Sequence, residues 1–381
     1  MIYDFLIIGA GSAGCNCAYA LNKAGKKVAI VDKEGVAKGA SGAAGAFLSP
    51  LPGKKNSYNS LVNNALKYSM DFYEDIIPQA ITKKGVLRVP NDNFDKNKLK
   101  DSSLKYEFKD AKNLQDISDN FRDIDGYLYK DAAVVNPSEV CNKLIEGCDF
   151  YTQDVQELIY KDNNYLIGEL KAKNIILTQG VNTPLVNYPY VDISPVFGVK
   201  IDVKSSTKIP FNIHKSISIS ADKQDGTISI GATKQNHYEE RLACTTTCDK
   251  CQFYINNDKE DIKSLLNQAD ELIDLHDLEV IEIHKGARAT IKGYFPVVGK
   301  IINYENSIKK YPSIKDGAKI PGDLLEYYPN IYTVNGLGSR GFVFGPYLAK
   351  ILKENILDNI DIPKEISLEK HFYKMARTKI S

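Results

Sequence analysis

The sequence predicts an α/β protein built from two domains. Apolar runs at residues 5–8, 27–31 and 174–177 have the continuous pattern of parallel strands that are buried on both faces. A further strand is expected at 330–335, and glycine-rich turns follow the first and the last of these strands. At 381 residues, the chain is longer than a single hydrophobic core usually supports, which favours about two domains.

The turn after the first strand, residues 9–14 (GAGSAG), matches the dinucleotide-binding fingerprint. Gly9 permits the tight turn, Gly11 lets the backbone approach a diphosphate, and Gly14 lets the following helix pack on the strand. The helix N-terminus offers N–H groups to the diphosphate, and Asp32, at the end of the second strand, is placed to meet the ribose hydroxyls. A glycine-rich turn without a ligand is the alternative. The fingerprint does not separate NAD from FAD.

Later segments carry motifs of one flavoprotein family. They are GASG at 39–42, the strand that closes on Gly180, the stretch GARAT around Arg288, and GSRG at 338–341 before a helix expected from Pro346. In this order and spacing the chain resembles the D-amino-acid-oxidase family of FAD enzymes, which includes glycine and sarcosine oxidases. Within that family it is most similar to the flavin domain of bacterial enzymes that modify the tRNA wobble uridine.

The resemblance implies a Rossmann-like FAD-binding domain with an inserted mixed β-sheet substrate domain. The FAD-binding domain is expected to be discontinuous and to comprise residues 1–80, 130–193 and 305–381. The substrate domain is then 81–129 and 194–304.

The resemblance also assigns roles. It implies that Val155, in a strand expected at 154–159, borders the adenine, and that Arg288 binds a substrate carboxylate, with Arg340 as its rival. Two positions depart from the family: Ala43 follows Ser41-Gly42 where the tRNA group has Asn, and Gly293 stands where the family often has Asp. The candidate cofactor-binding residues, from fingerprint and resemblance together, are Gly9, Gly11, Ser12, Ala13, Gly14, Asp32, Lys33, Ser41, Gly42, Val155, Gly180, Gly338, Ser339, Arg340 and Gly341.

Composition and charge exclude several classes of protein. The formal net charge of +1 excludes binding to nucleic acid or membrane by bulk charge alone, although a local basic patch remains open. No apolar run reaches the roughly 18 to 20 residues of a membrane span, and the N-terminus lacks a signal peptide's basic segment. Seven unevenly spaced cysteines suit a reducing compartment. We therefore expect a cytoplasmic protein that does not contact a membrane.

Three cysteines form a CxxxCxxC pattern. Cys244, Cys248 and Cys251, with His237 upstream, match a spacing used for metal clusters. A reduced surface loop is the favoured interpretation, so no metal ligand is assigned and a zinc or cluster site stays an alternative.

The leading functional hypothesis is the oxidation of a secondary amine that bears a carboxylate, by hydride transfer to noncovalent FAD, with release of an amine and a 2-oxo acid. In the version that the tRNA-modifying group implies, the substrate is the carboxymethylaminomethyl group of a tRNA wobble uridine, and a separate methyltransferase is an expected partner. The alternatives are a small-molecule oxidase of glycine, sarcosine or a D-amino acid, and a non-enzymatic flavin- or metal-binding scaffold.

Overall fold

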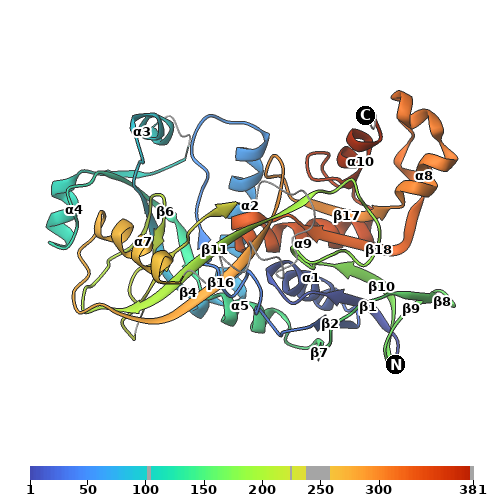
Figure 1. Cartoon of the computed structure of the whole chain (residues 1–381), viewed down its shortest axis with the longest axis horizontal. Coiled ribbons are helices and arrows are strands. Elements are labelled where there is room, and N and C mark those ends of the chain that lie inside the picture. Colours follow the sequence, from blue (N-terminus) through green and yellow to red (C-terminus); the bar gives the residue numbers. More distant parts are fainter. Residues whose placement is uncertain (101–103, 224, 237–257, 378–381) are drawn as a thin grey trace.

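The computed structural model describes residues 1–100, 104–223, 225–236 and 258–377. Two β-sheets, each with its own helices, divide the molecule along its long axis (Figure 1). The first sheet lies on the right of this view and the second on the left. The predicted α/β class with a second mixed sheet is confirmed. Cys244, Cys248, Cys251 and His237 lie outside the described residues.

The first sheet is mainly parallel. It runs in the order β17-β18-β10-β1-β2-β7, with β17 antiparallel to β18 and the pair β9 and β8 continuing from β10. Its strands are β17 (Val297–Ile302), β18 (Tyr327–Asn335), β10 (Leu170–Leu177), β1 (Tyr3–Ile8), β2 (Val28–Asp32), β7 (Asp149–Thr152), β9 (Asn164–Ile167) and β8 (Ile159–Lys161).

Helices cover both faces of this sheet, which explains why its strands are apolar throughout. Phe5 and Ile7 of β1 pack into one core, and Leu6 and Ile8 pack into the core on the opposite face. The first core is closed by α1 (Ser12–Lys23), α2 (Ser57–Ile76), α5 (Pro137–Leu144) and α9 (Gly341–Asp358). The second is closed by α8 (Tyr304–Lys310) and α10 (Leu368–Arg377).

The second sheet is mainly antiparallel and follows the order β15-β11-β14-β13-β12-β4-β6-β3, with β16 on β11 and β5 on β6. The strands are β15 (Gln235–Asn236), β11 (Ile193–Lys204), β14 (Thr227–Gly231), β13 (Ser218–Ile219), β12 (Asn212–His214), β4 (Ile81–Arg88), β6 (Gly126–Val135), β3 (Phe47–Leu48), β16 (Glu279–Ile291) and β5 (Glu107–Lys109). The helices on this side are α3 (Asn93–Lys100), α4 (Ala111–Ile117) and α7 (Asp258–Asp270). Leu265 and Ala269 of α7 pack against the sheet.

The expected domain division remains a prediction, and the sheets distribute two segments differently. β17 falls within the range 194–304 expected for the substrate domain, yet it pairs with β18 in the first sheet. β3, expected in the FAD-binding domain, pairs with β6 in the second sheet. Both strands lie next to points where the chain passes from one sheet to the other, and the local sequence there does not indicate the partner strand.

The helix expected from Pro346 begins earlier, at Gly341 (α9). A proline inside a helix removes the N–H that would bond to the carbonyl four residues before it, here that of Phe342. The hydroxyl of Tyr73 donates to this carbonyl instead, at 3.0 Å. A tertiary contact from α2 thus satisfies the group that the proline leaves unpaired.

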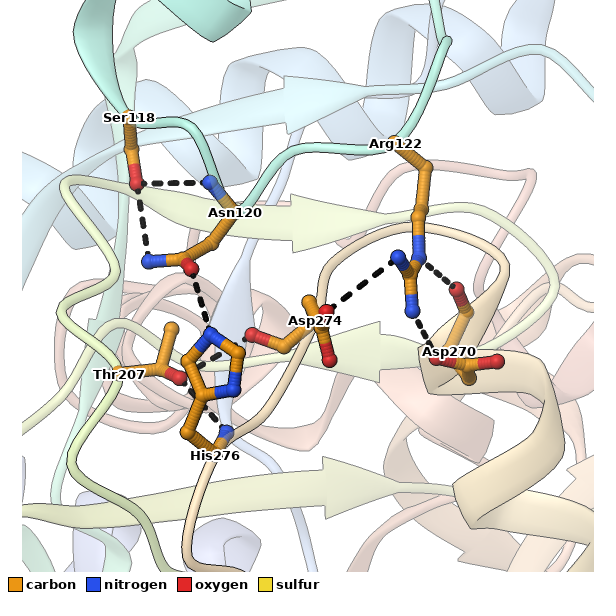
Figure 2. A network of polar contacts seen from close by, with 7 residues as sticks. All are labelled: Ser118, Asn120, Arg122, Thr207, Asp270, Asp274 and His276. Carbon is orange, nitrogen blue, oxygen red and sulfur yellow. Dashed lines mark hydrogen bonds and ion pairs between the residues drawn. The ribbon is translucent and has the colours of Figure 1, made fainter.

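A polar network joins the segment after α4 to the end of α7 and the segment after it (Figure 2). Arg122 lies just past α4, and its guanidinium pairs with Asp270 at the end of α7. The same guanidinium lies 3.4 Å from the carboxylate of Asp274. His276 Nε2 lies 3.0 Å from Asn120 Oδ1. These groups join the segment after α4 to the segment after α7, so Arg122 and His276 have structural roles. Among the described residues, every helix is too short or too polar to span a bilayer.

Candidate functional site

The turn after β1 packs closely against the end of β10. A Cβ at Gly14 would lie 1.8 Å from the carbonyl oxygen of Gly9, and one at Gly9 would lie 2.5 Å from that of Thr178. Gly9 also has a φ of +109°, which favours glycine. Packing of the chain itself therefore requires these two glycines. Gly11 differs, because a Cβ there would meet only the side chain of Ser41, with the hydroxyl at 3.1 Å.

Two helix N-termini meet beside Gly11. The backbone N–H of Ser12 donates to the Ser41 hydroxyl (2.8 Å), and the Ser12 hydroxyl donates to the carbonyl of Gly341 (2.8 Å), the first residue of α9. Ala13 follows in the same turn of α1 and packs against the first core. Neither α1 nor α9 has an acidic residue in its first turn. Two positive helix ends with no acidic residue in the first turn of either helix suit an anionic group such as a diphosphate.

Asp32 connects the end of β2 to this turn. One carboxylate oxygen accepts from the N–H of Ala10 (2.8 Å), and the other accepts from the N–H groups of Glu34 (2.9 Å) and Gly35 (3.1 Å). Asp32 therefore holds the turn at residues 9–14 in place, a role that the sequence did not indicate. Lys33 next to it is exposed and lies 3.7 Å from the carboxylate of Glu34.

Val155 is not in a strand, so the strand expected at 154–159 is wrong. It lies in the irregular segment between β7 and β8, half-buried against the second core of the first sheet. Val155 and Leu158, three residues apart, are the residues of this segment that pack against that core.

The loop at 39–42 lies directly under β16. A Cβ at Gly42 would lie 2.1 Å from the carbonyl oxygen of Ala37, so the turn is tight. A Cβ at Gly286 would lie 2.9 Å from the Cβ of Ala43 and 3.0 Å from the Cα of Ala40. The second sheet therefore touches the predicted cofactor loop through Gly286.

The C-terminal turn completes the set of predicted loops. Gly180, with a φ of +61°, accepts through its carbonyl a hydrogen bond from the Asn335 side chain (2.9 Å). Gly338, with a φ of +56°, opens η4 (Gly338–Arg340), in which Ser339 is exposed. A Cβ at Gly338 would lie 3.6 Å from the methyl group of Thr290. The ends of β1, β10 and β18 thus gather these loops at one edge of the sheet, where ligands of α/β proteins bind.

Arg288 lies within β16. Gly286, Arg288 and Thr290 alternate along the strand and share the face turned toward the loops at 39–42 and 338–341. Both Nη atoms of Arg288 donate to the carbonyl of Thr233 (3.3 Å each) above Gly198. Burial lowers the pKa of Arg288. In the described part of the chain, Arg288 has no carboxylate partner, so its charge is available to a ligand.

Arg340 ends η4 and reaches across to the segment after β3. Its Nη1 donates to the carbonyl of Ser49 (2.8 Å), and the Tyr58 hydroxyl of α2 is its other neighbour. Burial lowers the pKa of Arg340, and the contact with Tyr58 opposes this shift. Both partners are neutral groups at pH 7.

Sequence reasoning missed Arg88 and His214 as site residues. They end β4 and β12, two parallel strands in which they are direct partners in the register, and both lie close enough to Arg340 for its charge to lower their pKa values. The available signal was the rarity of arginine, since Arg88 is one of only six in the chain.

The residues at this edge fit FAD. The space opposite Gly11, the two uncapped helix ends and the anchored carboxylate of Asp32 match what the diphosphate and ribose of a dinucleotide need. The loops at 39–42 and 338–341 extend the same edge toward Arg288 and Arg340.

Comparison with known proteins supports this assignment. The chain is 24% identical over 378 residues to the tRNA 5-methylaminomethyl-2-thiouridine biosynthesis bifunctional protein MnmC of Legionella pneumophila (strain Corby), with 92% of this chain and 54% of the relative covered. It is 26% identical to the protein of the same name from Campylobacter fetus subsp. fetus (strain 82-40), with 93% and 56% covered. The chain thus spans about half the length of these curated relatives.

Solved structures share the fold. Glycine oxidase from Bacillus cereus ATCC 14579 superimposes with a TM-score of 0.72 at 19% identity, covering 94% of this chain and 96% of the oxidase. L-Amino acid deaminase from Proteus myxofaciens gives a TM-score of 0.74 at 14% identity, with 97% and 93% covered. The family described as FAD dependent oxidoreductase (DAO) matches residues 4–355. The chain is therefore a member of the DAO family of FAD-dependent oxidoreductases.

Proposed function

We propose that this enzyme oxidises a secondary amine that carries a carboxylate, with noncovalent FAD as the acceptor. The observation that carries the proposal is Arg288, a half-buried guanidinium without a carboxylate partner among the described residues, on the face of β16 that is turned toward the cofactor loops. A planar guanidinium binds a carboxylate through two parallel hydrogen bonds and so fixes its angle.

The chain's residues would bind and orient the substrate. FAD, when bound, accepts the hydride that leaves the carbon next to the nitrogen. The substrate imine is then hydrolysed by water to an amine and a 2-oxo acid. Arg288 would set the position of that carbon by binding the carboxylate. The half-buried environment of Arg288 and Arg340 would strengthen the electrostatic interaction of each guanidinium with the substrate. No acid–base side chain is required if the amine binds in its neutral form.

For the substrate, we propose the carboxymethylaminomethyl group of a tRNA wobble uridine. Its carboxymethyl part would leave as glyoxylate, and the aminomethyl group would remain on the uridine. The support is the match to MnmC proteins over 92% of this chain. Because these relatives are named as bifunctional, we propose that a methyltransferase acts together with this activity. A small amino acid is the second candidate, supported by the fold shared with glycine oxidase and by the net charge of +1.

One experiment separates the two substrates. FAD-loaded protein is mixed without oxygen with glycine, sarcosine, a D-amino acid, or tRNA that carries the carboxymethylaminomethyl group, and the flavin absorbance is followed. We expect bleaching with the tRNA and glyoxylate in the products. Bleaching only with a small amino acid would show that the second candidate is the substrate. The absence of bleaching with every amine would refute amine oxidation.

A further inference from the structure

Two arginines and a histidine, Arg88, Arg340 and His214, lie where the second sheet meets η4. Arg88 and His214 are side by side because β4 and β12 pair in parallel with these two residues in register. The N–H of Val89 donates to the carbonyl of His214 (2.9 Å), which continues the pairing past the strand end. Arg340 approaches from the first sheet, tied to the carbonyl of Ser49.

Among the described residues, no carboxylate forms an ion pair with Arg88 or Arg340. Within the described residues, Arg88 makes no hydrogen bond or ion pair, and its Nε atom is buried without a partner. The hydroxyl of Ser49, next to Arg340, is also buried without a partner. His214 Nδ1 pairs with the Ser218 hydroxyl at 2.6 Å. A bound oxyanion would supply an acceptor for the Nε of Arg88 and for the hydroxyl of Ser49.

The charges facing this cluster are nearly all positive. Burial and the charge of Arg340 lower the pKa of Arg88 to about 10, so Arg88 remains a cation at pH 7. Burial and both arginines lower the pKa of His214 well below its usual range, so it is neutral. Asp95 attracts Arg88 through space, but its carboxylate accepts hydrogen bonds from Asn91 and forms no ion pair with the arginine.

Keeping two guanidinium groups together without a counter-ion costs folding free energy. Such arrangements are concentrated at binding sites, where a ligand supplies the missing charge. Arg122 provides the contrast, since the chain gives it both Asp270 and Asp274.

We propose that Arg88 and Arg340, beside His214, form a second oxyanion subsite that is separate from Arg288. β16, which carries Arg288, joins the sheet at β11, and β14, β13 and β12 lie between β11 and β4. Arg288 and Arg88 thus lie on strands that are not neighbours in the sheet. This inference rests on the proposed function and narrows its substrate to an amine with a second oxyanion, either the phosphate of the nucleotide that bears it or a second carboxylate.

The test uses FAD-loaded protein, with inorganic phosphate and malonate as probes and isothermal titration calorimetry as the measurement. We expect wild-type protein to bind at least one of them, and Arg88→Met to weaken that binding by roughly tenfold to a hundredfold. Arg122→Met is the matched control and should leave the affinity unchanged. Preference for phosphate would identify a nucleotide as the source of the oxyanion, and preference for malonate would identify a small dicarboxylate.

The unfolding temperature without probe gives an independent readout. Arg88→Met should unfold at the same temperature as wild type or higher, because an unpaired buried charge is removed, whereas Arg122→Met should unfold at a lower temperature. Arg88→Gln replaces Arg88→Met if the latter does not fold. Unchanged probe binding in the Arg88 variant, or no binding to wild type, overturns the subsite. Neither result depends on amine oxidation, whose failure would show only as an unbleached flavin.

Discussion

Tyr73→Phe should destabilise the protein, because it removes the donor that replaces the N–H missing at Pro346. The Tyr73 hydroxyl is fully buried and donates to the carbonyl of Phe342 at 3.0 Å. Burial raises the pKa of Tyr73 well above its usual value, so the hydroxyl remains a donor at any pH used for folding studies. Without it, the carbonyl is buried and unpaired, which costs about 1 to 3 kcal/mol of unfolding free energy.

Urea denaturation of the FAD-free protein measures this loss, and two variants sharpen it. Tyr127→Phe is the matched control, since the Tyr127 hydroxyl is buried without a partner among the described residues. It should be neutral or stabilising. Pro346→Ala restores an N–H that can donate to the carbonyl of Phe342. In that background, Tyr73→Phe should lower the unfolding free energy by at least about 1 kcal/mol less than it does in the wild type. Equal costs of Tyr73→Phe in both backgrounds would refute the reasoning.

Three further results are expected. Asp32→Ala should weaken FAD binding by about 1.5 to 3 kcal/mol, measured by fluorescence titration, because the turn loses its anchor at Ala10; unchanged affinity would remove Asp32 from the site. Acid precipitation should release all the yellow cofactor into the supernatant, and a yellow pellet would contradict noncovalent binding. Arg288→Lys should keep FAD but lose roughly 2 to 4 kcal/mol of transition-state stabilisation in kcat/KM on the carboxylated amine. If the loss is as large on the neutral ester, the carboxylate contact belongs to Arg340.

The parts of the fold that depend on local sequence were predictable. The strand at 5–8, its glycine turn and the helix after it follow from apolar runs and backbone geometry, and the structure has them as β1, the turn and α1. The start of α9 was not predictable in this way. Sequence rules place a proline in the first turn of a helix, whereas Tyr73 lets this helix begin at Gly341, five residues before Pro346.

The site was predictable to the same extent. Gly9, Gly14 and Asp32 are close in sequence and belong to one motif, so their proximity could be inferred. The pairing of Arg88 with His214 depends on strand partners far apart in the chain, and nothing near either residue indicates it. The position of Arg288 inside β16 was missed because its neighbours Gly286 and Ala287 interrupt the apolar pattern of a strand.

The order of strands in the first sheet also determines when this protein can fold during synthesis. β1 and β2 emerge from the ribosome first, but β10 and β18, which complete the sheet, come much later. At 5 to 20 residues per second, roughly 15 to 60 s separate the end of β2 from the start of β18. β10 supplies the second partner of β1 earlier, but until β18 emerges, residues Ile175–Leu177 of β10 have no native partner on the side away from β1. Since η4 and α9 follow β18, a nascent chain can complete the cofactor site only after β18 has been synthesised.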